Sequence, residues 1–112
     1  MDRVQRKRIK GFKLPLNTLV ITRGTPFGNP WKKITDFQSQ NMDTGECILN
    51  TNVVALFEDR LTINSKQLFV DTCENRGIEH LACFCPVDSP CHGDVWLQVW
   101  EDYKNQPKSE NQ

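Results

Sequence analysis

The chain has 112 residues, which suffices for one domain with a modest hydrophobic core that folds without disulfides or a metal ion. Hydrophobic residues make up 38% and charged residues 25%, as in ordinary globular proteins, and no apolar run reaches the roughly 20 residues of a membrane span. Because no apolar secretory signal opens the chain, we expect a cytoplasmic protein whose five cysteines stay reduced.

Positive charge is concentrated at the start of the chain. Residues 1–33 contain nine Lys and Arg and one acidic residue, whereas residues 34–112 contain five basic and thirteen acidic residues. Such a segment can meet phosphates, nucleic acid or an acidic protein, or lie against the chain's own acidic part. We expect a basic N-terminal arm over 1–13, part of which can be a weak edge strand, a single α/β domain over 14–104 and a polar tail over 105–112.

The first regular element is a predicted strand over 19–22, where the residues are apolar and β-branched. It leads into a loop over 24–31, in which two Gly, two Pro and one Asn interrupt any regular structure. Such a loop must be held by its own side chains, so we expect Phe27 and Trp31 to anchor it.

Two helices are predicted next. Apolar residues recur at three- and four-residue steps from about residue 46 to residue 61, which is typical of an amphipathic helix. A second helix is predicted over 65–75, with Gly77 as its stop.

A second strand is predicted over 78–85, followed by a helix with Ser89 as its N-cap and an apolar stripe over 95–103. Two strands separated by a helical crossover favour a parallel pair with a right-handed connection. The predicted architecture is therefore a small α/β sandwich with a mainly parallel sheet, to which residues 8–14 or 32–38 can add strands.

A segment of twelve residues near the C-terminus concentrates reactive side chains. Side chains alternate along a strand, so Cys83 and Cys85 should point to the same face. Cys91 and His92 fall at the second and third positions of the last helix, where free amides and the helix dipole stabilise a thiolate. Cys91 is therefore a candidate nucleophile, with His92 as its base or ion-pair partner and Asp94 as the group that orients the ring.

Other interpretations of this segment remain open. Four of its residues have the ligand types of a zinc site: Cys83, Cys85, Cys91 and His92. Against zinc, neither half has the familiar two-residue gap, and the adjacent Cys91 and His92 rarely share one ion comfortably. The strand cysteines can instead be small core residues, with His92 only capping its helix.

Two motifs in this order carry a family resemblance. The first is Arg23-x-x-x-x-Gly28-Asn29-Pro30-Trp31, and the second joins Leu81-Ala82-Cys83-Phe84-Cys85-Pro86 to Cys91-His92-Gly93-Asp94-Val95. Together they resemble the "domain of unknown function 4326", a family found in bacteria and phages. The resemblance covers about Leu19 to Tyr103, and the segment before Leu19 departs from the family pattern. It implies a small Rossmann-like α/β domain and assigns no activity.

Both motifs follow predicted parallel strands, and open α/β sheets bind ligands beyond the carboxyl ends of their strands. Carried over by position, the resemblance adds to the cysteine–histidine segment the residues Arg23, Gly28, Asn29, Pro30 and Trp31. Arg23 offers a planar fork to phosphate or carboxylate, Gly28 permits close backbone approach, and Trp31 can stack on a base. Our leading hypothesis is a domain that binds an anionic, nucleotide-like small molecule and acts as a Cys/His-dependent hydrolase or transferase.

Two alternatives come from other classes of protein. The basic arm would suit a phage-type accessory or inhibitor protein that binds a host protein or nucleic acid in the host cytoplasm. A zinc-stabilised module would bind about one ion through the three cysteines and the histidine of the reactive segment. Zinc is the only cofactor that the sequence raises, and no membrane partner is expected.

Overall fold

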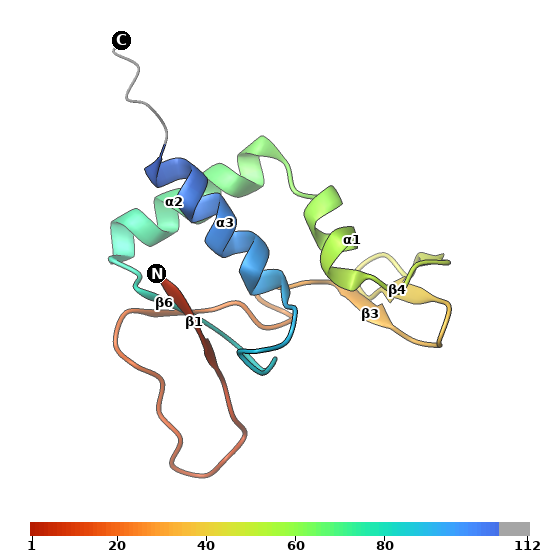
Figure 1. The fold of residues 1–112 in the computed structure, drawn as a ribbon, viewed down its shortest axis with the longest axis horizontal. Coiled ribbons are helices and arrows are strands. Elements are labelled where there is room, and N and C mark those ends of the chain that lie inside the picture. Colours follow the sequence, from red (N-terminus) through yellow and green to blue (C-terminus); the bar gives the residue numbers. More distant parts are fainter. Residues whose placement is uncertain (106–112) are drawn as a thin grey trace.

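Residues 1–105 are described by a computed structural model, in which two small sheets and three helices make up a mixed α/β fold (Figure 1). The tail predicted over 105–112 lies outside the described residues, apart from Asn105. Within residues 1–105, no helix combines the length and the apolar character needed to cross a membrane.

Three strands form a parallel sheet with β6 in its centre: β1 (Asp2–Gln5), β2 (Thr18–Val20) and β6 (His80–Cys83). Val4 and Val20 both pair with Ala82, so the three strands end at the same edge of the sheet. The strands predicted over 19–22 and 78–85 are thus present and pair in parallel. Over its first five residues the chain takes the form of an edge strand, which is one of the two forms that the sequence left open.

A second, antiparallel sheet consists of β3 (Trp31–Lys33), β4 (Ser39–Asn41) and β5 (Cys47–Ile48). It lies beside α1 (Val53–Asp59) at one end of the fold (Figure 1). Of the two ranges that could add strands, 32–38 overlaps β3, whereas 8–14 contains no strand in the described chain. The parallel arrangement expected for the sheet therefore applies to β1, β2 and β6 alone.

The first predicted helix starts later than the apolar repeat indicates. Cys47–Ile48 form β5, and α1 begins only at Val53, so the prediction of a helix from about residue 46 was wrong. The side chains of Asn50 and Asn52 accept hydrogen bonds from backbone amides two and three residues further on. The Asn52 bond is the N-cap of α1, so the helix starts at Val53 and does not extend back through this segment.

The other two helices lie close to their predicted ranges. α2 (Ile63–Arg76) ends at Gly77, which has φ 60° and ψ 42° and provides the predicted left-handed stop. α3 (His92–Lys104) is capped by Cys91, so the prediction of Ser89 as its N-cap was wrong. Cys91 has an extended backbone, and the helical conformation therefore begins only at His92.

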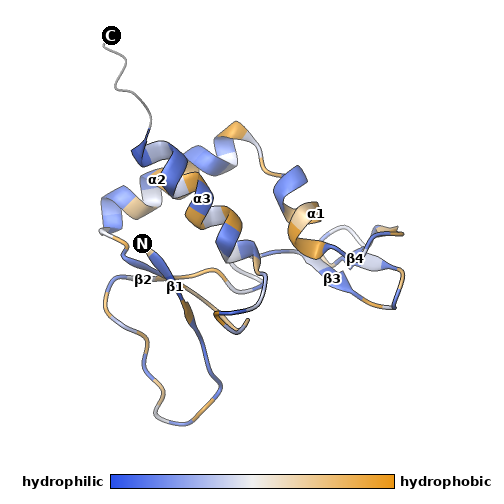
Figure 2. Ribbon diagram, in the orientation of Figure 1, coloured by the Kyte–Doolittle hydropathy of each residue, from blue (hydrophilic) through white to orange (hydrophobic). Residues whose placement is uncertain are grey.

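Trp96 on α3 lies at the centre of the hydrophobic core. Its ring stacks on Phe69 with ring centroids 4.5 Å apart, and it meets Phe27 and Phe57 edge to face, each at 5.5 Å. The indole Nε1 donates a hydrogen bond to the Phe27 carbonyl at 2.9 Å. Phe27 therefore anchors the 24–31 loop in the core, as predicted. Figure 2 shows that α3 carries both hydrophobic and hydrophilic residues.

Candidate functional site

A pocket of about 740 Å³ lies at the carboxyl ends of the parallel strands, between the loops that follow β1, β2 and β6. Both sequence motifs contribute to its lining, with the predicted site residues Arg23, Asn29, Trp31, Cys83, Cys85, Cys91 and His92. Gly28, Pro30 and Asp94, which the sequence also placed in the site, do not contribute to this lining. The two motifs thus meet where parallel strands end.

Arg23 and Asn29 hold the loop that follows β2. Arg23 Nε donates to the Asn29 carbonyl at 3.3 Å, and Arg23 Nη2 donates to the Trp31 carbonyl at 3.4 Å. The Asn29 side chain accepts from the Trp31 amide and donates to the Val53 carbonyl, each at 2.9 Å. These bonds attach the loop to β3 and α1, while the exposed Arg23 still lines the pocket.

Gly28 packs against the chain itself. A Cβ at this position would lie 2.4 Å from the Thr22 carbonyl oxygen and 2.9 Å from the Arg23 Cα. The close approach that glycine permits here is therefore between two stretches of the same loop.

We expect Gly28→Ala to lower the free energy of unfolding by about 1–3 kcal/mol, because the clash involves backbone that must shift as a unit. Urea unfolding followed by circular dichroism measures the loss. Pro26→Ala, at an exposed position of the same loop, is the matched control and should cost less than about 1 kcal/mol. A Gly28→Ala protein as stable as the control would contradict this account of the loop.

Three thiols converge beside the pocket. The sulfurs of Cys83, Cys85 and Cys91 all lie within 4.8 Å of one another, and all three thiols are free. The sulfurs of Cys83 and Cys91 are closest, at 3.0 Å. Cys91 Sγ also accepts a hydrogen bond from the Gly93 amide at 3.4 Å, as the N-cap of α3.

The pKa values of these thiols follow from their mutual contact. The hydrogen bond between the Cys83 and Cys91 sulfurs lowers the pKa of Cys83 to about 5, even though burial opposes the charge. The same hydrogen bond, together with burial, raises the pKa of Cys91 above its ordinary value. Burial raises the pKa of Cys85 as well. The pKa values of Cys83 and Cys91 are therefore coupled and shift in opposite directions.

His92 is oriented by the backbone of Ile21, the residue that follows β2. Its Nε2 lies 2.6 Å from the Ile21 carbonyl oxygen, which can only accept, so this nitrogen carries a proton. Burial lowers the pKa of His92 and favours the neutral ring, which leaves Nδ1 with a free lone pair. That nitrogen lies 3.5 Å from Cys91 Sγ. The group that orients the ring is therefore Ile21, and not Asp94 as the sequence led us to expect.

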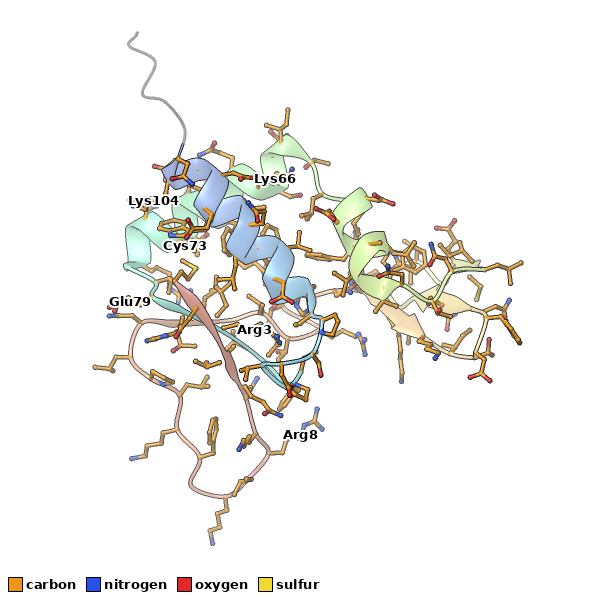
Figure 3. The ribbon with its side chains drawn as sticks, in the orientation of Figure 1. Arg3, Arg8, Lys66, Cys73, Glu79 and Lys104 are labelled. Carbon is orange, nitrogen blue, oxygen red and sulfur yellow. The ribbon has the colours of Figure 1, made fainter. Side chains whose placement is uncertain are left out.

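Asp94 interacts instead with Arg3, a buried residue that the sequence placed in a basic arm. Arg3 Nε lies 3.2 Å from an Asp94 carboxylate oxygen, and Arg3 Nη2 donates to the Val87 and Ser89 carbonyls at 2.8 and 2.7 Å. Figure 3 shows Arg3 beside the first turn of α3. No local pattern in the sequence marks this role, because it depends on the pairing of β1 with β6.

Arg6 and Arg8 also line the pocket, and sequence reasoning missed them as site residues. Their guanidinium carbons lie 5.2 and 4.3 Å from the centroid of the Phe84 ring, a cation–π arrangement. Figure 3 shows Arg8 on the long loop that follows β1. Among the described residues that line the pocket there are three arginines and neither Asp nor Glu.

Comparison with known proteins identifies one family. The model of the family described as "Domain of unknown function (DUF4326)" matches residues 4–102. The match begins at residue 4, so the interpretation that the segment before Leu19 departs from the family pattern was wrong. No curated protein and no solved structure matches the chain.

Proposed function

Because the chain belongs to the family of domain of unknown function 4326, whose description names no activity, we propose its function from the pocket itself: binding of an anionic, nucleotide-like small molecule. The observation that carries the proposal is the convergence of Arg6, Arg8 and Arg23 on one concave site that no described carboxylate lines. Guanidinium groups pair with phosphate and carboxylate oxygens in a planar fork, so such a lining favours an anion.

The size and the walls of the pocket support a ligand of nucleotide class. A volume of about 740 Å³ is within the range of pockets that hold small molecules and cofactors. Aromatic residues Trp31 and Phe84 form part of the wall, beside the arginines. The pocket lies at the carboxyl ends of parallel strands, where open α/β sheets bind ligands. This position also supports the proposal of a Rossmann-like domain.

The proposal concerns binding and includes no covalent step at Cys91. That sulfur caps α3 and lies against Cys83, and its side chain is only 2% exposed. A thiol engaged in this way has little access to a substrate atom.

The basic segment offers a second use, as the sequence analysis noted. Lys7, Lys10 and Lys13 are exposed on the loop after β1 and do not line the pocket, so they would be free to meet a host protein or nucleic acid. Arg6 and Arg8 on the same segment line the pocket. The segment therefore provides two separable sets of charges, and variants can distinguish the two functions.

The test is calorimetric titration of the purified chain with adenosine and guanosine mono-, di- and triphosphates, and with the uncharged nucleosides. We expect binding of the phosphorylated ligands, and at least a tenfold loss of affinity, about 1.4 kcal/mol, in the double variant Arg6→Ala/Arg8→Ala. These two arginines are better probes than Arg23, because Arg23 also holds the loop that contains Asn29.

The matched control is Lys7→Ala/Lys10→Ala, which removes the same charge from the same loop outside the pocket. It should retain the affinity of the unaltered protein for the phosphorylated ligand. The proposal fails if none of the ligands binds, or if the lysine variant loses as much affinity as the arginine variant. In the second case the attraction would come from the general charge of the loop.

A further inference from the structure

We propose that Cys83, Cys85 and Cys91, with His92 as the fourth ligand, bind a zinc ion that joins the end of β6 to the start of α3. We call these four residues the thiol–imidazole cluster. The proposal concerns a site separate from the arginine wall and does not depend on the binding of an anion. It rests on the positions of the side chains, on their hydrogen bonds and on the elements that carry them.

The separations between the sulfurs fit tetrahedral coordination. With zinc–sulfur bonds of about 2.3 Å, two thiolates on one tetrahedral ion lie roughly 3.8 Å apart. The observed separations run from 3.0 Å, between Cys83 and Cys91, to at most 4.8 Å within the group of three. The expected spacing lies between the shortest separation and this upper limit, and none of the three sulfurs is used in a disulfide.

His92 has the hydrogen bonding of a metal ligand. Histidines that bind metals donate their second ring N–H to a carboxylate or a backbone carbonyl, and His92 Nε2 bonds to the Ile21 carbonyl at 2.6 Å. Its Nδ1 is 3.5 Å from Cys91 Sγ, close to the roughly 3.6 Å that zinc–nitrogen and zinc–sulfur bonds at a tetrahedral angle would give. His92 is not among the three residues whose ligand atoms all lie within 4.8 Å of one another, so its ring must move closer to the Cys83 and Cys85 sulfurs to complete the set.

The backbone explains why these neighbours can both reach one ion. Cys91 is extended, with φ −152° and ψ 152°, whereas His92 is the first residue of the helix. The change of conformation between them brings the sulfur and the ring nitrogen to the same side. Cys83 is the last residue of β6 and Cys85 lies in the bend that follows it, which leaves their sulfurs within 4.8 Å of each other.

Neighbouring groups stabilise the cysteines as thiolates and hold the segments to which these cysteines belong. The Gly93 amide donates to Cys91 Sγ, and Arg3 Nη1 lies 3.9 Å from Cys83 Sγ. These two N–H groups stabilise negative charge on the sulfurs. Arg3 also bonds the Val87 and Ser89 carbonyls in the loop between the two pairs of ligands. A zinc ion with four protein ligands has no open position, so we infer a structural role in fixing the pocket wall.

The first test is elemental analysis of the full chain, purified without chelator from cells grown with added zinc. We expect about one zinc per chain, a fall in melting temperature on removal of the ion by a chelator, and recovery when zinc is returned. Substitution with Co²⁺ should produce the absorption of tetrahedral cobalt together with thiolate-to-cobalt charge transfer. A folded, metal-free protein whose melting temperature does not respond to zinc would overturn the proposal.

Variants then identify the ligands. Cys85→Ser, at a half-buried position, should abolish the thermal response to zinc, and His92→Gln should weaken zinc binding at least tenfold. Cys47→Ser and Cys73→Ser, an exposed and a buried thiol outside the cluster, are the controls and should retain one ion. Zinc binding that survives Cys85→Ser or His92→Gln unchanged would overturn the ligand set.

Two further measurements test the proposal even if a variant does not fold. If a variant does not fold, the cobalt spectrum of the unaltered chain still decides, since the absence of thiolate charge transfer contradicts the site. Rapid alkylation of Cys91 in a folded, metal-free chain would also overturn the proposal and favour the interpretation of Cys91 as a nucleophile. None of these measurements uses a nucleotide, so failure of the zinc site and failure of the anion pocket are distinguishable.

Discussion

Trp96→Ala is expected to lower the free energy of unfolding by about 3–5 kcal/mol, a large part of the total stability of a domain of this size. The side chain is 2% exposed and contacts three aromatic rings, so its removal leaves a cavity that fixed neighbours cannot fill. The Phe27 carbonyl would also lose its hydrogen bond from Nε1. Urea unfolding followed by far-ultraviolet circular dichroism measures the change without depending on tryptophan fluorescence.

The control is Trp100→Ala, one turn further along α3. Trp100 is half-buried at the edge of the core, and its contacts include Tyr103, at 5.7 Å between ring centroids, and the ammonium of Lys104. Its replacement should cost less than half as much as that of Trp96, because less apolar surface is lost and solvent can fill the space. Equal losses in the two variants would show that the core is not centred on Trp96.

This comparison illustrates what a helical repeat can and cannot predict. The stripe over 95–103 predicts that Trp96 and Trp100 lie on one face of α3, and the structure agrees. The repeat does not predict which of the two tryptophans is more buried, because their burial depends on where α2 and the 24–31 loop pack. Phe69 and Phe27 belong to those distant segments, and they determine that Trp96 is the buried one.

The wrong prediction of a helix over 46–52 has a similar cause. Leu49 continues the apolar repeat of the following helix, yet it is 79% exposed in the structure. The repeat treats Leu49 and Leu56 alike, whereas Asn52 between them caps the N-terminus of α1 and sets its first residue at Val53. The hydrophobic period alone therefore extended the predicted helix beyond the residue that caps its N-terminus.

The candidate site was predictable in outline, since two motifs that follow parallel strands must approach one another at the ends of those strands. The arginines of the site could not be predicted from the sequence. Arg3, Arg6 and Arg8 reach the site because β1 pairs with β6, nearly eighty residues later in the chain. Long-range strand pairing of this kind leaves no periodic signal in a four-residue strand. The basic composition near the N-terminus therefore indicates positive charge but does not show which part of the fold that charge faces.

Arg3→Met should lower the free energy of unfolding by about 3 kcal/mol, because charge-assisted hydrogen bonds to two carbonyls are lost at once. Methionine keeps much of the volume of the side chain, so the loss reports the guanidinium and not a cavity. The Val87 and Ser89 carbonyls would be left without their donor, and the loop between β6 and α3 would lose its attachment to β1. Urea unfolding measures the stability, and limited proteolysis measures the opening of this loop.

Asp94→Asn separates the hydrogen bonds of Arg3 from its ion pair. The Asp94 side chain is 51% exposed, so the pair with Arg3 is screened by solvent and its loss should cost less than about 1 kcal/mol. Arg3→Lys keeps the positive charge but cannot form a fork to two carbonyls, and it should resemble Arg3→Met more than the unaltered protein. If Asp94→Asn proved as harmful as Arg3→Met, the ion pair and not the carbonyl contacts would hold this part of the fold. The expected order therefore assigns to Arg3 the attachment of the segment that bears Cys85 and Cys91 to the first strand of the sheet.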